Sequence, residues 1–593
     1  MHCDNMHRTT LAAPFHLRQV SESLTSKWWL AYGPTNNLPD ATTWRDEHVA
    51  FGLARPELSP LQRFVAVGDV WLSNRAHLLN KFECLSDRED LNDVQVIARL
   101  WDLFEDRTVQ LLEGMFGIAV WDRERQRLLL ARDRVGARTL YYTQGEATRW
   151  VAPQLRTLAS RVSKDLDLVA LRDYLCCAFV PGERTMWRDA RELRPGATLS
   201  FPDGEIQQYW KIEERITDGE KPLDWHARRL RAVLDKVVEE YLPPEAPVGA
   251  YLSGGLDSSL VVALAARLHT DSVHTYSIHF GDECPNELEF SDLVARHCGT
   301  EHRVIEITPE EMWDQLPETM SCLDDPIGDP LTVPNLILGR AAKESADVIL
   351  NGEGGDPCFG GPKNQPMLLT SLYRGALQSG VESCSILTSV TPDLTSAYLA
   401  SFQKCSLDLP RLLRPEVSSA VGSHPSIFES ELNGQANYVN QLMLINTRFK
   451  GADHILTKVN NLTRAVGLHG RSPLFDQRVV EMSLGIPPQY KLSGAEEKAV
   501  LKEAVRDLLP EAILKRPKSG MMVPVQLWFR KRWRRRARAL LLSRRARIRD
   551  YLNQDVIRDW LDYREDTWSR YGVKLWLLVS LELWLRSHQP KLS

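Results

Sequence analysis

The sequence predicts a two-domain protein: an α+β domain built on antiparallel sheet, followed by an α/β domain with a doubly wound parallel sheet and a helical C-terminal part. Three observations predict this fold class. The chain has 593 residues, which is more than one hydrophobic core usually holds. Short apolar runs separated by turn signals fill residues 64–142, whereas strand-like and helix-like segments alternate after residue 226. Beyond about residue 365 helical periodicity dominates.

The first domain is predicted from its hairpin pattern. Apolar residues at 116–121 and 127–131 flank the polar residues 122–126, which is typical of an antiparallel hairpin. Residues 93–112 have the apolar spacing of a helix. Helix and antiparallel strands in one segment indicate an α+β domain.

Residues 211–222 are polar and non-periodic, as expected of a linker. We therefore expect one domain over residues 1–210 and a second over residues 223–593. The second should begin with a helix at 226–242, a strand at 246–252, a helix at 258–268, a strand at 273–280 and a helix at 290–299. This alternation indicates a parallel sheet, in which ligands bind at the carboxyl ends of the strands.

The composition narrows the function classes. A net charge of −5 gives no overall attraction to nucleic acid or to an anionic membrane. The ten cysteines form no CxxC pair, which predicts a reduced, cytoplasmic chain without a zinc site. The most apolar late stretch, residues 575–585, is shorter than the ~20 residues that cross a bilayer. We expect a buried helix there and no membrane span.

Residues 528–549 form a strongly basic segment in which Trp528, Phe529 and Trp533 stand between arginines. Three interpretations are open: the solvated face of a helix, a nucleic-acid surface with stacking aromatic rings, or a docking site for an acidic precursor peptide or partner protein. Because the rest of the chain is acidic, we expect the first interpretation and no nucleic-acid partner.

The segment SGGLDSS, residues 253–259, lies between a predicted strand and a predicted helix. Gly254 and Gly255 let the backbone turn tightly, and serine hydroxyls with the free amides of the helix start favour an anion such as a polyphosphate. Asp257 would repel that anion unless a divalent ion lies between them, and Mg²⁺ is the usual choice. The alternative is a glycine turn that caps the helix through Ser258.

A second acidic glycine loop, GEGGD, follows another apolar run at residues 352–356. Gly352 and its neighbouring glycines let Glu353 and Asp356 approach a ligand closely. If the two preceding strands belong to one sheet, Asp257 and Asp356 could share a metal ion. A glycine-rich surface turn is the alternative for this loop taken alone.

Four ordered motifs resemble asparagine synthetases and their amide-forming relatives. They are SGGLDSS, DDPIGDPLTVPN at 324–335, GEGGD, and KRPKSGMMVP at 515–524. The segment LLEGMFGIAVWDRERQRLLLARDRVGARTLYY, residues 111–142, is similar to the glutaminase half of those enzymes. The resemblance implies an Ntn-type glutaminase-like domain followed by an ATP-pyrophosphatase-like synthetase domain.

The resemblance also implies a chemistry. ATP transfers AMP to a carboxylate, and an amine then displaces AMP to form an amide. Lys518 would neutralise charge in the transition state, Glu353 would act as a base or orient the nucleophile, and Asp257 with Asp356 would hold Mg²⁺. The residues implied to contact ATP are Leu252, Ser253, Gly254, Gly255, Asp257, Ser258, Ser259, Ser277, Gly352 and Glu353.

The N-terminal part departs from the glutamine-using members of the family. Those enzymes expose an N-terminal cysteine, but this sequence begins Met1, His2, Cys3, and the bulky His2 should keep Met1 attached. The family's asparagine-glycine loop for glutamine is replaced by VGDVWLSN at 67–74. We therefore expect the glutaminase-like domain to lack glutaminase activity, so that the amine comes from elsewhere.

β-Lactam synthetases and lasso peptide cyclases are two related groups that use another amine. NGEGGDPCFGGPKN, from residue 351, and GLHGRSPLFDQRVV, from residue 467, resemble the lasso cyclases most. The expected reaction joins the N-terminal amine of a precursor (core) peptide to an Asp or Glu side chain, beside a leader peptidase and a leader-binding protein. The alternatives are an ammonia-dependent asparagine synthetase, a β-lactam synthetase-like enzyme and a non-catalytic scaffold.

Overall fold

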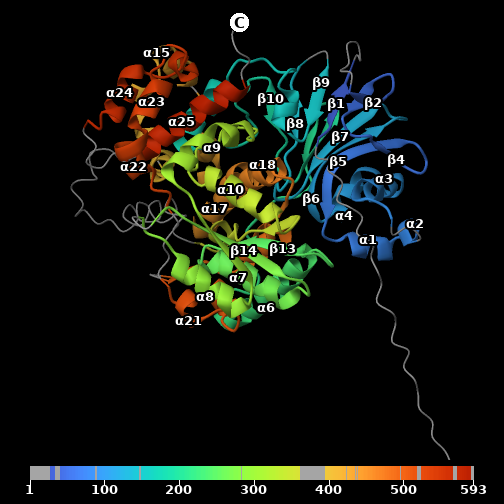
Figure 1. The fold of residues 1–593 in the computed structure, drawn as a ribbon. Coiled ribbons are helices and arrows are strands. Elements are labelled where there is room, and N and C mark those ends of the chain that lie inside the picture. The colour runs from blue at the N-terminus through green and yellow to red at the C-terminus, as the bar shows by residue number, and fades with distance from the viewer. Residues whose placement is uncertain are drawn as a thin grey trace, which may run out of the picture.

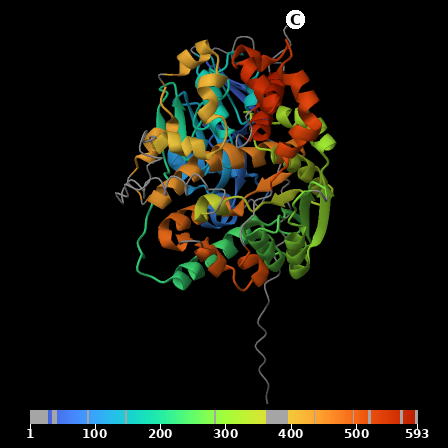
Figure 2. The same cartoon turned by 90° about the vertical axis from the view of Figure 1, so that its left-hand side faces the viewer.

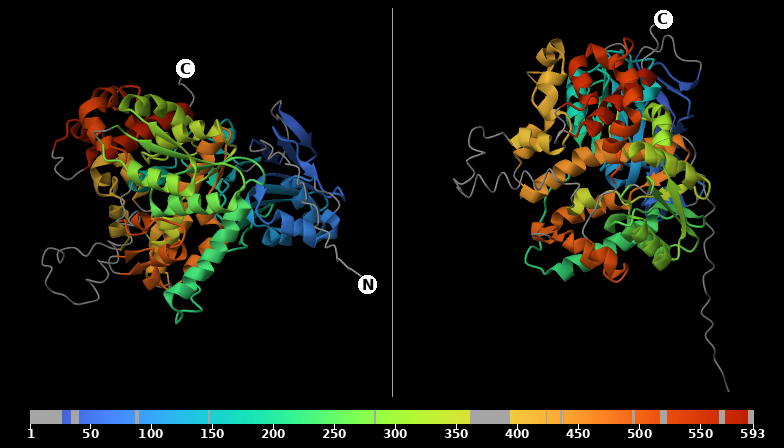
Figure 3. Two further views of the ribbon diagram at one scale, coloured as in Figure 1. Left: turned by 60° about the horizontal axis from the view of Figure 1, so that its bottom comes forward. Right: turned by 60° about the vertical axis from the view of Figure 1, so that its left-hand side comes forward.

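The computed structural model confirms the predicted fold class (Figure 1). It describes residues 27–33, 41–86, 90–145, 148–281, 284–360, 394–422, 424–434, 436, 438–493, 496–516, 522–564 and 570–588. In the left view of Figure 3 the blue strands of the antiparallel domain lie on the opposite side of the molecule from the red C-terminal helices. The green strands and helices of the second domain lie below both regions in Figure 1.

Two six-stranded antiparallel sheets form the N-terminal domain, with strand orders β10-β8-β9-β1-β3-β2 and β12-β11-β7-β6-β5-β4. Apolar side chains from both sheets share one core between them, among them Leu30, Val65 and Leu128. The strands are β1 (Trp29–Tyr32), β2 (Thr42–Arg45), β3 (Val49–Gly52), β4 (Glu57–Leu58), β5 (Phe64–Leu72), β6 (Gly114–Asp122), β7 (Arg127–Arg132), β8 (Tyr141–Thr143), β9 (Arg149–Ala152), β10 (Ala190–Glu192), β11 (Ala197–Phe201) and β12 (Ile206–Gln208).

The predicted hairpin is present as β6 and β7, with Ala119 opposite Leu130. The predicted helix over 93–112 is shorter than expected. Helix α3 (Asp93–Phe104) starts with a capping box between Asn92 and Gln95 and stops where Glu105 takes a φ of 48°. A short second helix, α4 (Thr108–Leu111), follows. A left-handed residue breaks the helical hydrogen-bond series, and the apolar spacing alone did not reveal it.

Five parallel strands form the sheet of the second domain, in the order β15-β14-β13-β16-β17. They are β13 (Val248–Tyr251), β14 (Val273–His279), β15 (Glu301–Glu306), β16 (Val348–Leu350) and β17 (His469–Arg471). Helices α6 (Leu223–Tyr241), α7 (Leu256–Leu268) and α8 (Leu288–Cys298) lie on one side of it, with α10 (Thr332–Lys343) and α18 (Thr457–Ala465) on the other (Figure 1). Strand β17 lies in the part of the chain where helical periodicity was predicted to dominate, and its three residues are too few positions to show a period.

Helices dominate the rest of the chain, as predicted. The segment at 575–585 lies inside α25 (Tyr571–His588), whose residues Leu575 to Val579 are fully buried. Within the described parts of the chain, no helix is long and apolar enough to cross a membrane. The other main helices are α5 (Leu168–Cys177), α9 (Pro309–Ser321), α11 (Gly355–Phe359), α17 (Tyr438–Ile445), α19 (Gln477–Gly485), α20 (Ala499–Ala504), α22 (Val525–Trp528), α23 (Arg534–Leu541) and α24 (Gln554–Leu561).

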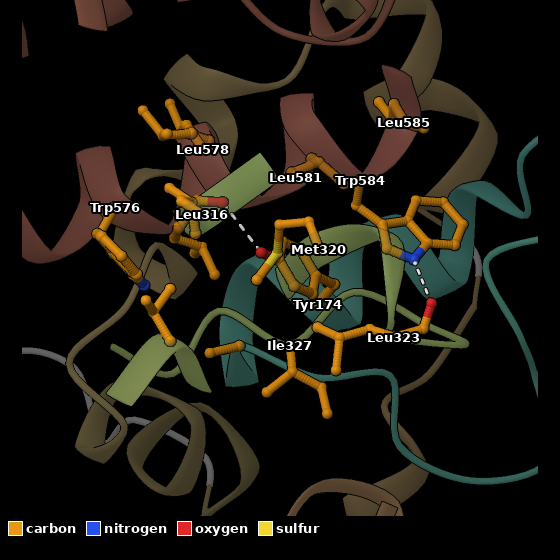
Figure 4. Packing of buried hydrophobic residues seen from close by; sticks show 14 of the residues in the cluster. Tyr174, Leu316, Met320, Leu323, Ile327, Trp576, Leu578, Leu581, Trp584 and Leu585 are labelled. Atoms are coloured by element: carbon orange, nitrogen blue, oxygen red, sulfur yellow. Dashed lines mark hydrogen bonds between the residues drawn. The ribbon is translucent and has the colours of Figure 1, made fainter. Parts of the chain in front are cut away.

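The two domains share a hydrophobic core. Tyr174, on α5 of the N-terminal domain, lies among Leu316 of α9 and Trp576 of α25 (Figure 4). Its hydroxyl donates a hydrogen bond to the backbone carbonyl of Leu577 at 2.9 Å. Figure 2 shows from another side how the red helices and the cyan strands lie together. The N-terminal domain is therefore held rigidly against the synthetase part.

Candidate functional site

The two glycine loops predicted to bind ligand lie next to each other. Strand β13 pairs with β14 on one side and with β16 on the other, all in parallel. The chain order reverses between β13 and β16, and such reversal points form the ligand crevice of doubly wound sheets. SGGLDSS follows β13 and GEGGD follows β16, so both loops emerge at this crevice.

The first loop is closed by its own serines. Ser258 Oγ accepts a hydrogen bond from the Ser253 amide at 3.1 Å and lies 3.0 Å from Ser253 Oγ. Ser258 Oγ donates to the Gly255 carbonyl at 3.2 Å. Gly255 is the N-cap of α7, and no side chain caps the helix, so the capping alternative through Ser258 is wrong. The first amides of a 13-residue helix therefore point into the crevice, as an anion site requires.

The second loop touches the first through its glycines. A Cβ on Gly352 would come within 2.5 Å of the Ser258 backbone nitrogen. A Cβ on Gly355 would lie 2.3 Å from the carboxyl carbon of Asp257. Contacts below 3 Å are not tolerated against backbone or a fixed carboxylate, so both positions require glycine. This close approach brings Asp356 to the same place as Asp257.

One lysine that the sequence analysis did not single out joins the two aspartates. Lys498 Nζ lies 2.7 and 2.5 Å from the two carboxylate oxygens of Asp257 and 2.5 Å from Asp356 Oδ1. Its side chain is only 3% exposed. Lys498 precedes α20 in a left-handed conformation, φ 57°, and its amide donates to the Lys491 carbonyl at 2.7 Å. A fixed backbone therefore directs this ammonium group between the two carboxylates.

The two aspartates keep Lys498 charged. Burial alone would lower the pKa of this lysine, but Asp257 first and Asp356 second raise it, and the net pKa lies above its ordinary value. A buried ammonium held by two carboxylates is thus a fixed positive charge at the crevice. Its position is the one in which a shared cation was predicted.

Several predicted ATP residues lie beneath the loops. Leu252, Ser259 and Ser277 are at most 3% exposed, and Ser277 Oγ donates to the Leu252 carbonyl. Their side chains support the first loop from below, so a nucleotide would meet the backbone at Leu252. Gly254, Gly255, Ser253 and Ser258 form the loop itself.

Glu353 and Lys518 differ in what the structure describes. The Glu353 amide donates to the side-chain carbonyl of Asn351 at 3.1 Å, which fixes the start of the second turn. Lys518 lies in residues 517–521, outside the described residues, as does Cys3. The preceding Arg516 donates to the Gly254 carbonyl at 3.2 Å and stacks on Phe290, so this segment begins at the first loop.

The acidic residues of the DDPIGDP segment contact other parts of the protein. Asp324 accepts a hydrogen bond from the Arg156 amide at 3.3 Å, and Asp325 accepts one from the Met186 amide at 2.8 Å, both in the N-terminal domain. Burial raises the pKa of both carboxyl groups. Asp329 binds the buried Lys458 at 2.7 Å. This segment therefore joins the domains.

The basic segment presents its charges to solvent but not its aromatic rings. Trp528, Phe529 and Trp533 are at most 4% exposed and belong to the hydrophobic core. Arg534 pairs with Asp562 at 2.8 Å and Arg536 with Asp314 at 3.0 Å. Stacking of bases on these rings has no place in this arrangement, and the segment agrees with a solvated helix face.

Within the described residues, protein side chains alone do not complete a metal site. Among them no group of three His, Cys, Asp or Glu residues could hold a metal ion. Asp257 and Asp356 are nevertheless close enough to share one cation, as their common contact with Lys498 demonstrates. Two carboxylates suit Mg²⁺ when phosphate oxygens and water complete the coordination. The pair thus fits a nucleotide-bound ion and not a metal held by protein alone.

Comparison with known proteins agrees with this geometry. An asparagine synthase family model matches residues 229–586, and a glutamine amidotransferase domain model matches residues 68–210. The Bacillus subtilis protein "Asparagine synthetase [glutamine-hydrolyzing] 1" is 25% identical, with 93% of this chain and 94% of that protein aligned. A Mycobacterium tuberculosis putative asparagine synthetase [glutamine-hydrolyzing] is 28% identical over 71% of this chain and 69% of its own length.

Similarity to solved structures is weak. An NH3-dependent NAD synthetase from Campylobacter jejuni has a TM-score of 0.19 at 14% identity, covering 35% of this chain and all of that one. A glutamine phosphoribosylpyrophosphate amidotransferase from B. subtilis has a TM-score of 0.21 at 11% identity, covering 57% and 80%. Both TM-scores are too low to support a conclusion about this chain. The family model over residues 229–586 covers more than half of the chain, and the protein therefore belongs to the asparagine synthase family as an ATP-dependent amide-forming ligase.

Proposed function

We propose that this ligase closes a macrolactam ring in a lasso peptide precursor. ATP would activate an Asp or Glu side chain of the core peptide, and the peptide's own N-terminal amine would then attack. The observation that carries the proposal concerns strand β5, where the glutamine loop of glutaminase relatives is expected. Two of its side chains, those of Val67 and Asp69, are buried in the core or paired with arginines. Val67 is 3% exposed and lies in the core between the sheets. Asp69 lies 3.2 Å from the Arg138 side chain and also contacts Arg464 of α18.

At Val67 and Asp69, both within the described residues, strand β5 offers no open polar group to glutamine. A glutamine site needs open polar groups at the loop, but Val67 is apolar and Asp69 is neutralised by two arginines. A ligase without its own ammonia supply needs a nitrogen that arrives with the substrate. A peptide that carries both carboxyl group and amine meets this need, and holding both ends together favours the reaction strongly.

The proposed reaction has two steps. A side-chain carboxylate oxygen attacks the α-phosphorus of ATP, the bond from that phosphorus to the bridging oxygen breaks, and pyrophosphate leaves. The peptide amine then attacks the acyl carbon, AMP leaves with the bonding electrons, and the nitrogen loses a proton. One amide, one AMP and one pyrophosphate result.

Residue roles follow from charge and position. The amides and hydroxyls of residues 253–259 would bind pyrophosphate at the start of α7. Asp257 and Asp356 would hold Mg²⁺, which offsets the charge of the phosphates. Lys498, as a fixed ammonium group, would stabilise negative charge that develops during acyl transfer. Glu353 would accept the amine proton or orient the amine, and the predicted catalytic role of Lys518 stays a prediction.

An ammonia-dependent asparagine synthetase is the second candidate. The B. subtilis relative aligns with 93% of this chain, and its name states a glutamine-hydrolyzing asparagine synthetase. The segment GLHGRSPLFDQRVV, which contains His469, resembles the lasso cyclases in sequence and favours the first candidate. A β-lactam synthetase-like reaction would use the same activated carboxylate on a smaller substrate.

The test measures pyrophosphate release with three substrates: a linear core peptide with a free N-terminal amine, the same peptide N-acetylated, and free aspartate with ammonium. The proposal expects release with both peptides, but a product that has lost one water only with the free amine. Release with aspartate and ammonium alone would replace it by the second candidate. Lys498→Ala is the inactive control.

The proposed function also implies a cellular location and two partner proteins. A lasso cyclase would work in the cytoplasm beside a leader peptidase and a leader-binding protein. Co-purification of this chain with those two proteins would support the assignment.

A further inference from the structure

The turn that carries Glu353 is held by the neighbouring strand β17. Asn351, 3% exposed, donates its backbone amide to the Arg471 carbonyl at 3.1 Å. Its side-chain nitrogen donates to the same carbonyl at 3.1 Å and to Ser472 Oγ at 2.9 Å. The side-chain oxygen is thereby turned towards the Glu353 amide, which donates to it at 3.1 Å. One buried amide therefore fixes the backbone of Glu353 relative to Arg471.

Arg471 is in turn held by Trp71 of the N-terminal domain and by Tyr241 of the synthetase domain. Its guanidinium carbon lies 4.4 Å from the ring centre of Trp71, and one of its nitrogens donates to the Tyr241 carbonyl at 2.7 Å. Trp71 meets the Tyr241 ring edge to face, with centres 4.8 Å apart. Arg471 is 5% exposed, so its charge is stabilised by contacts within the protein, these among them, and not by water.

Trp71 lies near the end of β5, two residues after Asp69. Asp69 pairs with Arg464 of the synthetase domain. Asp69 and Trp71 thus both reach into the second domain. Of these two, Trp71 is the one that contacts Arg471, which holds the turn of Glu353. The strand that would carry a glutamine loop in glutaminase relatives here supports the ligase site.

We propose that Trp71 is a positioning residue for Glu353, acting through Arg471 and Asn351. The N-terminal domain sets the geometry of the second glycine loop through this chain of contacts. The inference rests on the proposed function in one respect, the part of Glu353 in acyl transfer. The positioning itself is independent of which substrate is used.

The first experiment measures hydrogen–deuterium exchange of the peptide covering residues 348–356 in the whole enzyme without substrate. Trp71→Ala should raise exchange in this turn by about tenfold, whereas Trp71→Phe should largely retain the wild-type rate because an aromatic face remains. Trp44→Ala is the matched control, since Trp44 packs on Phe51 in the sheet of the same domain that contains β2 and β3. Unchanged exchange in Trp71→Ala overturns the proposal.

The second experiment measures turnover with whichever substrate wild type uses. Trp71→Ala should lower kcat about tenfold and leave the KM for ATP within about twofold. Asn351→Ala should do the same, and the double variant should be no worse than either, because both break one chain of contacts. Additive losses, or a KM change alone, overturn the proposal.

These outcomes separate two failures. If wild type ignores the peptide but uses aspartate, the proposed function fails while the exchange experiment and the kcat comparison still test Trp71. If Trp71→Ala merely unfolds the domain, Trp71→Phe and the control Trp44→Ala decide through the same exchange measurement. Wild-type exchange in Trp71→Phe together with raised exchange in Trp71→Ala is the expected result.

Discussion

Acidic and basic side chains meet both at the carboxyl end of the parallel sheet and at the end of strand β5, but with different results. At the sheet, Asp257 and Asp356 share one lysine, Lys498, and the glycines beside them keep side chains away. At β5, Asp69 is 8% exposed between two arginines from different elements. One cation for two carboxylates leaves net negative charge for a metal ion, whereas two cations for one carboxylate leave nothing to bind. The number of cations for each carboxylate, more than the presence of acidic residues, therefore distinguishes a binding site from a structural joint between the two domains.

The largest effect is expected from removing the shared lysine. Lys498→Ala should lower amide formation about a thousandfold, because a fixed positive charge disappears from the crevice and the neighbouring carboxylates of Asp257 and Asp356 then repel each other more strongly. Formation of the amide product, which has lost one water, is the measurement. Lys515→Ala is the matched control, since Lys515 pairs with Glu511 on the surface at 77% exposure. Activity close to wild type in Lys498→Ala would remove this residue from the site.

The joint at β5 is expected to contribute stability and not chemistry. Asp69→Asn removes the carboxylate that lies against the largely buried Arg138 and Arg464, so the free energy of unfolding should fall by about 3 kcal/mol. The control is Asp165→Asn, whose partner Arg188 lies 3.4 Å away with both side chains more than half exposed, and which should cost less than about 1 kcal/mol. Urea unfolding measures both. Equal losses in the two variants would contradict the contrast between the regions.

The loops could be predicted from the sequence, and their partners could not. SGGLDSS and GEGGD each follow an apolar run, and in a parallel sheet such positions meet at one edge, so the proximity of Asp257 and Asp356 was predictable. Lys498 lies 142 residues after Asp356, at the start of α20, and nothing in its spacing marks it. Trp71 reaches its role only through the docking of the two domains. The roles of such residues depend on packing between distant parts of the chain, and local sequence patterns do not show that packing.

The aspartates are expected to differ from ordinary surface acids in their response to magnesium. Asp257→Asn and Asp356→Asn should each raise the Mg²⁺ concentration for half-maximal pyrophosphate release about tenfold, because one charged ligand is lost. Asp314→Asn is the control, as Asp314 is 65% exposed and pairs with Arg536 on the surface. A magnesium titration at fixed ATP distinguishes them. Identical midpoints in all variants would mean that neither aspartate holds the ion.

The smallest effect concerns two buried lysines seven residues apart. Lys498 has a pKa raised by its carboxylates, so its stabilising contribution is complete below its ordinary value of 10.5 and is lost only above that pH. Lys491 is fully buried and donates to Asn440 Oδ1 at 2.6 Å. Burial lowers the pKa of Lys491 to about 7, against the weaker raising effects of Cys358 and Glu214.

The sign for Lys491 follows from proton counts. Between about pH 7 and 10.5 the unfolded chain keeps this lysine protonated and the folded chain does not, so folding releases a proton and the free energy of unfolding rises with pH. The slope should approach about 1.4 kcal/mol per pH unit in this range. Lys491→Met should remove this part of the slope in urea unfolding between pH 7.5 and 9.5, and Lys498→Met should leave it unchanged. A slope that is the same in wild type and Lys491→Met would show that Lys491 stays charged in the folded protein, because a lysine protonated in both states binds and releases no proton on unfolding.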